Sequence, residues 1–271
     1  MTMDTLIAGR HFLVDADPLS LGHKSLAVNL SDLAAMGAEP AWALLSLSLP
    51  KIDSGWLQDF VQGFKTLAER FGVRLVGGDT CQGGLSISVQ LTGFLEADHA
   101  MLRSNARPGD LVYVTGALGD AALALRLLRA GEDPGALRQR LEMPQPRVTE
   151  GRALAVAGVR CCIDLSDGLV GDLGHVCQRS QCAARIQVDR LPLSPAMASH
   201  VRATGDLTLA LAGGDDYELC FTLPAAARQR VEKLPFPCTC IGEILPGQGV
   251  ALVREDGGSL PLPSAWEHFS T

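Results

Sequence analysis

The apolar residues of this chain recur at two different spacings, and each spacing predicts a different kind of element. Residues 57–71 repeat apolar side chains at helical spacing and stop before Gly72, which predicts an amphipathic helix. Residues 85–95 instead alternate apolar and polar side chains, which is typical of a half-buried antiparallel strand. Residues 41–49 form an apolar run that Pro50 ends, and this run predicts a buried strand.

One predicted helix carries an acid inside its apolar surface. Residues 18–37 are mostly apolar, and Gly37 stands where a helix C-cap is expected. Asp32 lies within this run, where burial of a lone carboxylate is costly unless a cation or a hydrogen-bond donor meets it. Asp32 is therefore either exposed on the outer face of the helix or part of a polar site.

The rest of the chain mixes helices and strands, which predicts an α/β (α+β) fold. Residues 1–7 are expected to end a strand, and strands are also expected at 73–76, 111–115, 161–165, 219–223 and 250–253, with helices near 119–130 and 147–157. The turn at residues 106–110 is the best candidate boundary, so we expect one domain at residues 1–107 and a second at residues 108–271.

Composition limits the class of protein. The chain has 271 residues, of which 47% are hydrophobic and 20% charged, so it has enough apolar material to bury a core. Its net charge of −7 argues against nucleic acid as a partner, because phosphate binding needs clustered Lys and Arg. No long apolar span or signal peptide is present, and the eight cysteines show no zinc spacing, so we expect a cytoplasmic protein without a membrane partner.

Candidate chemistry lies in three glycine-containing turns with aspartates, at residues 77–80, 164–168 and 213–217. Glycines let backbone N–H groups approach a phosphate, and aspartates beside such turns suit Mg²⁺, which shares its ligands with substrate phosphates. No phosphate-binding P-loop and no dinucleotide fingerprint occurs. Together with Asp4 and Asp32 the turns favour phosphate chemistry with several metal ions, whereas Asp120 is interpreted as a helix-capping carboxylate.

These pieces resemble one known family along essentially the whole chain. The matching segments are residues 4–12, 24–38, 77–80, 103–110, 163–173, 213–221 and 266–269. In this combination they resemble the thiamine-monophosphate kinases, of the superfamily that includes aminoimidazole ribonucleotide synthetase. The resemblance implies two domains: an N-terminal mixed sheet that pairs with its twin in a homodimer, and a C-terminal α/β sandwich. It also implies that the nucleotide site lies near the dimer interface.

The resemblance also assigns roles to particular residues. The implied Mg²⁺ ligands are Thr2, Asp4, Asp32, Asp79, Asp164 and Asp167. The implied ATP contacts are Gly78, Asp79, Arg103 and Ser166, and the implied thiamine phosphate contacts are His11, Asp215 and Trp266. No general base or covalent nucleophile is expected. Family members usually carry a further metal-binding turn before Asp4, and we expect this chain to lack it.

The implied reaction is direct transfer of the ATP γ-phosphoryl group to thiamine monophosphate, giving thiamine diphosphate and ADP. Three alternatives stay open on the sequence alone. The first is another ATP-using enzyme of the same superfamily. The second is a non-catalytic binding relative, because the first metal turn is absent, and the third is a structural dimerisation protein.

Overall fold

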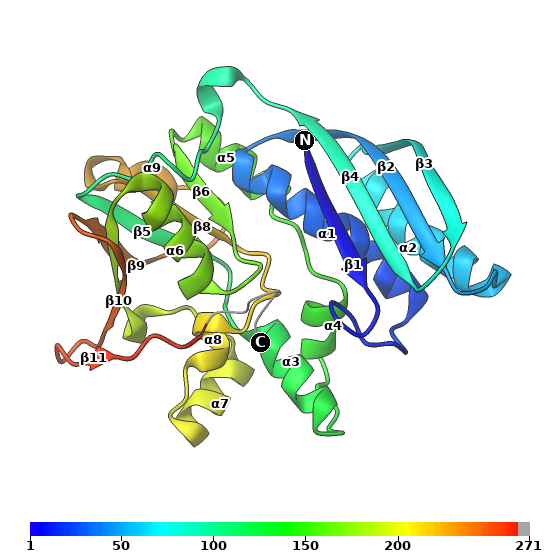
Figure 1. Ribbon diagram of the computed structural model, residues 1–271. Helices are drawn as coiled ribbons and strands as arrows, with labels where there is room; N and C mark the ends of the chain where they lie inside the picture. Colours follow the sequence, from blue (N-terminus) through cyan, green and yellow to red (C-terminus); the bar gives the residue numbers. More distant parts are fainter. Residues whose placement is uncertain (265–271) are drawn as a thin grey trace.

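The computed structural model describes residues 1–264 and contains two β-sheets with helices between and around them (Figure 1). The smaller sheet has four strands in the order β1-β4-β2-β3. These are β1 (Thr2–Ile7), β4 (Ser86–Phe94), β2 (Glu39–Leu49) and β3 (Arg74–Gln82). Strand β4 runs antiparallel to both of its neighbours, whereas β2 and β3 are parallel.

Two helices cover the inner face of this sheet, α1 (Pro18–Met36) and α2 (Ser54–Arg70). Both begin at an aspartate N-cap, because Asp17 accepts from the Ser20 N–H and Asp53 accepts from the Trp56 N–H. Helix α1 ends at Gly37 in the left-handed region, as the sequence predicted.

The larger sheet has seven strands in the order β11-β10-β7-β9-β5-β8-β6. Its strands are β5 (Asp110–Thr115), β6 (Cys161–Asp164), β7 (Ala183–Gln187), β8 (Leu219–Pro224), β9 (Cys238–Leu245), β10 (Gly249–Val253) and β11 (Ser259–Leu260). The further α-helices are α3 (Asp120–Arg129), α4 (Leu137–Glu142), α5 (Val148–Val156), α6 (Leu169–Ser180), α7 (Pro195–Thr204), α8 (Thr208–Ala212) and α9 (Arg228–Glu232). Short 3₁₀ turns lie at Ala97–His99, Val188–Arg190 and Ala225–Ala227.

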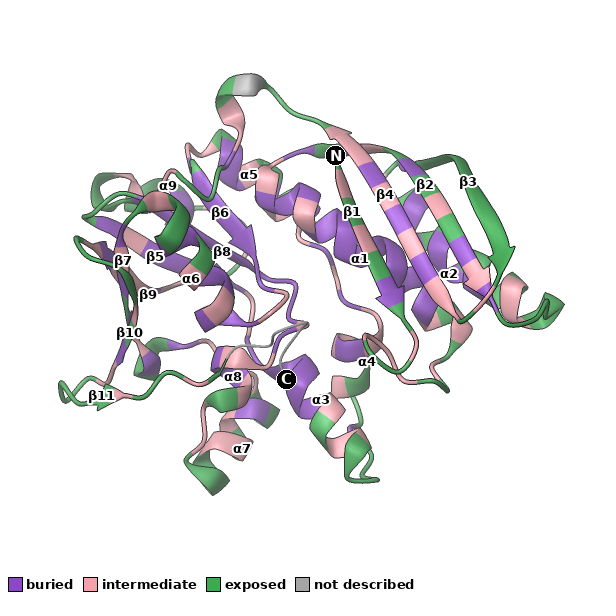
Figure 2. Cartoon of the chain, in the orientation of Figure 1, coloured by how far each residue is buried: buried purple, intermediate pink, exposed green. Residues whose placement is uncertain are grey.

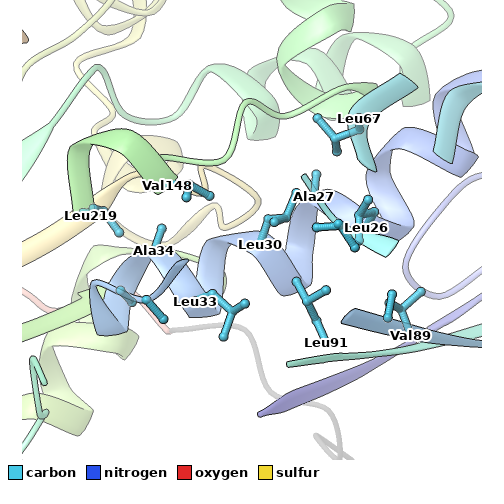
Figure 3. Close-up of a cluster of buried hydrophobic side chains, with 14 of the residues drawn as sticks. Leu26, Ala27, Leu30, Leu33, Ala34, Leu67, Val89, Leu91, Val148 and Leu219 are labelled. Carbon is cyan, nitrogen blue, oxygen red and sulfur yellow. The ribbon is translucent and has the colours of Figure 1, made fainter. Parts of the chain in front are cut away.

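Helix α1 joins the two sheets into one structure. Its buried side chains, among them Leu26 and Leu30, share a hydrophobic cluster with Leu91 of β4 and with Leu219 of β8 (Figure 3). Alternation along β8 divides the larger sheet between two cores, because Leu219 faces this cluster while Cys220 faces the cluster beneath α6. Helix α1 therefore packs against both sheets.

The outer face of the four-stranded sheet is exposed and partly apolar (Figure 2). Trp42 and Phe94 lie on it with their rings edge to face, 5.2 Å between centroids, and both side chains are about half exposed. Met3, Ile7 and Leu44 add further exposed apolar area. Exposed apolar patches of this kind are typical of interaction surfaces.

The structure confirms the predicted α/β class and most of the predicted elements. One prediction about local structure is wrong: residues 77–80 do not form a turn after a short strand, because β3 continues through them to Gln82. They pair in register with β2, so that Asp79 lies opposite Ser46. Within residues 1–264 no helix is long and apolar enough to cross a membrane.

Candidate active site

A cavity of about 700 Å³ lies between the two sheets and collects most of the aspartates predicted to matter. Its lining includes Asp4 from β1, Asp32 from α1, and Asp164 and Asp167 from the end of β6. These four carboxylates come from three separate elements, so only the tertiary fold brings them together.

The carboxylates at this end of the cavity disfavour one another's charge. The pKa of Asp4 is raised to about 6, mainly by burial and also by the charges of the nearby Asp32 and Asp167. Burial likewise raises the pKa of Asp164 to about 7, with contributions from Asp32 and Asp4. Burial also raises the pKa of Asp32, against the opposing effects of the Thr2 hydroxyl and Arg103. A bound cation would stabilise the charged form of clustered acids such as these, whose pKa values are raised.

Hydrogen bonds hold these carboxylates in place. Thr2 donates through its hydroxyl to Asp32, and the Ser31 hydroxyl donates to Asp164 at 2.7 Å. Asp172, buried in α6, accepts from the backbone N–H of Asp167 at 3.0 Å. These hydrogen bonds fix the orientation of the groups at the acidic end.

Two turns meet at the centre of the site with their backbones in contact. The N–H of Asp215 donates to the carbonyl of Ser166 at 2.9 Å. Gly214 has φ +71°, and a Cβ there would lie 2.6 Å from the Ser166 carbonyl oxygen. Gly168 has φ +98°, and a Cβ there would lie 2.7 Å from Cα of Ala212. Both positions therefore require glycine, which explains the glycines that drew attention in the sequence.

The other end of the cavity carries a different set of groups. Asp215 accepts from Lys24 Nζ and from the Tyr217 hydroxyl, both at 2.9 Å. His11 also lines the cavity, with its Nδ1 accepting from the Ile7 N–H at 2.9 Å. Arg126 and Arg129 of α3 add positive charge to the lining. The cavity thus has an acidic end at Asp4 and a mixed end at Asp215.

Among the predicted ATP contacts, the structure places Ser166 in the cavity but Gly78 and Asp79 on β3, outside it. Asp79 is paired with Ser46, which lies on the exposed outer face of the sheet, whereas Asp4 is paired with Val89 on the buried inner face. Asp79 and Asp4 of one chain therefore lie on opposite faces of the sheet.

Two further predicted residues stand apart from the cavity lining. Arg103 is exposed and not among the lining residues, yet it is close enough to Asp32 to oppose the rise of that carboxyl's pKa. Trp266 lies outside the described residues.

The donor set fits a hard divalent cation without enclosing one. Within residues 1–264 no three His, Cys, Asp or Glu side chains are close enough together to ligate a metal ion by themselves. Carboxylate oxygens spaced in this open way leave ligand positions for water and phosphate oxygens, which is how Mg²⁺ is usually bound.

Several functional contacts were not predicted from the sequence. Lys24, Ser31, Asp172 and Tyr217 all touch a site aspartate or its loop, yet each looks ordinary in its own segment. A lysine in the buried interior of a helix is the one available signal, because lysine is almost never buried without a partner.

The interpretation of Asp120 as a capping residue is wrong. Gly119 occupies the N-cap of α3, and no side chain caps that helix. Asp120 is buried instead and accepts from the Ser194 hydroxyl at 2.5 Å.

Comparison with known proteins agrees with this architecture. Residues 1–95 match the family model of the AIR synthase related protein, N-terminal domain, and residues 107–255 match that of the C-terminal domain. Thiamine-monophosphate kinase of Salmonella typhimurium is 45% identical over 285 residues, covering 100% of this chain and 86% of that protein. Thiamine-monophosphate kinase of Aquifex aeolicus is 36% identical over 279 residues, covering 99% of this chain and 87% of that protein.

Solved structures show the same relation. Thiamine-monophosphate kinase from Stenotrophomonas maltophilia superimposes with a TM-score of 0.88 at 45% identity, covering 96% of this chain and 85% of that one. A structure described as AaThiL complexed with AMPPCP and TMP also gives a TM-score of 0.88, at 35% identity over 99% of this chain and 86% of that one. The matches extend over both sheets and over every segment that lines the cavity, and on this basis the chain belongs to the thiamine-monophosphate kinase family.

Proposed function

We propose that this protein transfers the γ-phosphoryl group of ATP to the phosphate of thiamine monophosphate, producing thiamine diphosphate and ADP. One observation carries the proposal: a single cavity holds four clustered carboxylates at one end and the Asp215 carboxylate at the other. The first group suits metal-bound phosphates, and the second suits the positively charged ring of the acceptor.

The residues of the cavity match the demands of this reaction. A phosphate monoester has a second pKa of roughly 6 and is already largely ionised at neutral pH, so it needs no general base. The obstacle is repulsion between two polyanions, and bound Mg²⁺ supplies the neutralising charge. Asp4, Asp32, Asp164 and Asp167 would hold the metal ions, and Thr2 orients Asp32. Ser166, which lines the same cavity, and Arg103, which lies near Asp32, would contact the nucleotide. The transfer is direct, with no phosphoenzyme.

We also propose a homodimer formed through the outer face of the four-stranded sheet. Asp79 and Gly78 lie on β3, three strands from Asp4, or about 14 Å at the usual strand spacing. Asp79 shares the outer face with Trp42 and Leu44. A second copy packed on this face would cover the apolar patch and let Asp79 of one chain contribute to the nucleotide site at the interface.

The assay for the main proposal is ADP release with ATP, excess Mg²⁺ and thiamine monophosphate, with thiamine as the control acceptor. Turnover confined to the monophosphate supports the proposal, and equal turnover with both acceptors contradicts it. Radiolabelled phosphate trapped on the protein in a single turnover would contradict direct transfer.

The dimer is tested by Leu44→Asp in sedimentation velocity, with Val156→Asp as the matched control. Both residues are exposed and apolar, but Val156 lies at the end of α5, away from the sheet. We expect only the Leu44 variant to be monomeric and to lose activity, and a dimer that survives this change contradicts the proposed interface. The domain boundary after residue 107, the cytoplasmic location, and the roles of His11 and Trp266 in binding the acceptor stay predictions.

A further inference from the structure

Lys24 is a buried cation inside the cavity-lining face of α1. Its side chain is 5% exposed, and its Nζ donates to Asp215 Oδ2 at 2.9 Å. A buried ammonium group without a partner is costly, so the pair with Asp215 explains why this position tolerates lysine. The same carboxylate has 30% of its side-chain surface exposed, which leaves it open to the cavity.

Tyr217 fixes the second oxygen of the same carboxylate. Its hydroxyl donates to Asp215 Oδ1 at 2.9 Å, and its side chain is buried. With one donor on each oxygen, the plane and direction of the Asp215 carboxylate are set, and its remaining lone pairs are available to a ligand.

The backbone of this turn is held in a demanding conformation. Asp215 has φ 60° and Tyr217 has φ 49°, both in the left-handed region that non-glycine residues rarely adopt. The N–H of Tyr217 donates to Leu165, and Asp216 accepts twice from the N–H of Gly119. Backbone strain kept in place by surrounding bonds is a common property of functional sites.

Tyr217 lines the cavity and lies near the charged groups at both of its ends. Burial raises the pKa of its hydroxyl well above the usual value, and the charges of Asp215, Asp4 and Asp164 raise it further. The Tyr217 hydroxyl therefore stays protonated and can donate its hydrogen bond to Asp215. Along α1, Lys24 and Asp32 are eight residues apart, or about 12 Å, which gives the separation of the two ends.

We infer that Lys24 and Tyr217 are positioning residues, which orient the Asp215 carboxylate toward the cationic ring of the acceptor while its phosphate lies at the acidic end. This inference rests on the proposed function and adds the residues that set acceptor affinity. Lys24 and Tyr217 act through Asp215 and do not touch the nucleotide.

The test compares KM values for thiamine monophosphate and for ATP in Lys24→Met, Tyr217→Phe and Asp215→Ala. Loss of a hydrogen bond to a charged group predicts a rise of about 10-fold to 100-fold in the acceptor KM for the Lys24 and Tyr217 variants. The KM for ATP stays within about twofold of wild type. Tyr113→Phe is the matched control, because Tyr113 is also buried but does not line the cavity.

The double variant Lys24→Met/Asp215→Ala distinguishes positioning from direct contact. If Lys24 acts through Asp215, the double variant has the acceptor KM of Asp215→Ala alone. A further loss in the double variant, or an equal rise in the KM for ATP, overturns the inference. Tyr217→Phe keeps the test valid if Lys24→Met unfolds, because it leaves no buried charge unpaired. If the wild-type protein is inactive, the proposed function is refuted. The inference about Lys24 and Tyr217 is then tested by calorimetry, which compares the affinities of wild type and the same variants for thiamine monophosphate.

Discussion

Two arginine–glutamate pairs in this protein have the same contact distance but very different surroundings. Arg147 Nη2 lies 2.5 Å from Glu218 Oε1, and Arg185 Nη2 lies 2.5 Å from Glu243 Oε1. The Glu218 side chain is 1% exposed, whereas that of Glu243 is 41% exposed. Glutamine in place of each glutamate therefore compares a buried ion-pair network with an exposed ion pair.

The structure sets the expected magnitudes. Glu218 also accepts from Arg140 Nη2 at 2.9 Å and from the Thr115 hydroxyl at 2.7 Å. Its neutralisation leaves two partly buried guanidinium groups with only their longer contacts, from Arg147 to Glu150 at 3.3 Å and from Arg140 to Asp120 at 3.9 Å. Breaking a buried pair in this way costs about 3–5 kcal/mol. An exposed pair contributes below about 1 kcal/mol, because solvent already screens it. For a chain of this size these values correspond to a fall in Tm of about 6–20 °C for Glu218→Gln and less than about 4 °C for Glu243→Gln.

Differential scanning calorimetry of the two variants and wild type in one buffer measures the difference. Repeating the scans in 1 M salt adds a second criterion, since salt weakens the exposed pair and leaves the buried network largely intact. Equal falls in Tm for the two variants, or a fall for Glu218→Gln that salt abolishes, would refute the argument from burial.

Two further predictions concern the acidic end of the cavity and the glycine contacts beside it. Because the folded-state pKa values of Asp4 (about 6) and Asp164 (about 7) lie above the ordinary value of 3.8, the free energy of unfolding of chelator-treated protein falls as the pH rises from about 4 to 7. Denaturant titrations across that range check the fall, and excess Mg²⁺ at pH 7 is expected to reverse it; a flat profile would contradict it. Gly214→Ala should lower stability by more than about 1 kcal/mol and abolish activity, since its Cβ would meet the Ser166 carbonyl, whereas Gly174→Ala, in an open helical position, should stabilise by up to about 1 kcal/mol. Thermal melts with the ADP-release assay test the pair, and an active, stable Gly214 variant would show that the two turns do not need their close contact.

Elements governed by local chemistry were predictable from the sequence. The alternation predicted over residues 85–95 matches the burial pattern of β4, and Gly37 ends helix α1 where it was expected. In each case the signal lies within one segment: the alternation within the strand itself, and the glycine at the end of the helix that it caps.

The extended structure of residues 77–80 in β3 depends on pairing with another strand, which the local sequence does not reveal. Glycine and aspartate at residues 77–80 favour a turn, but pairing with β2 keeps the segment extended. Gly78 is required there for another reason, because a Cβ would lie 1.8 Å from the Leu45 carbonyl oxygen at φ +153°. The face on which Asp79 lies follows from strand register, which no pattern within residues 74–82 specifies.

Helix α1 explains why the site combines predictable and unpredictable residues. Positions 20, 24, 28 and 32 form one stripe along the cavity, while other faces of the helix pack in the hydrophobic cluster that both sheets share and against α5. A helix buried on nearly all sides shows no clear polar face, so Lys24 and Asp32 look like interruptions of an apolar run. Their partners, Asp215 and Thr2, lie 191 and 30 residues away. Because this helix packs against both sheets and carries a residue at each end of the cavity, any rotation of α1 would move Lys24 and Asp32 together. Under the proposed function, helix α1 therefore fixes the separation of the groups that bind the acceptor's ring from those that bind its phosphate.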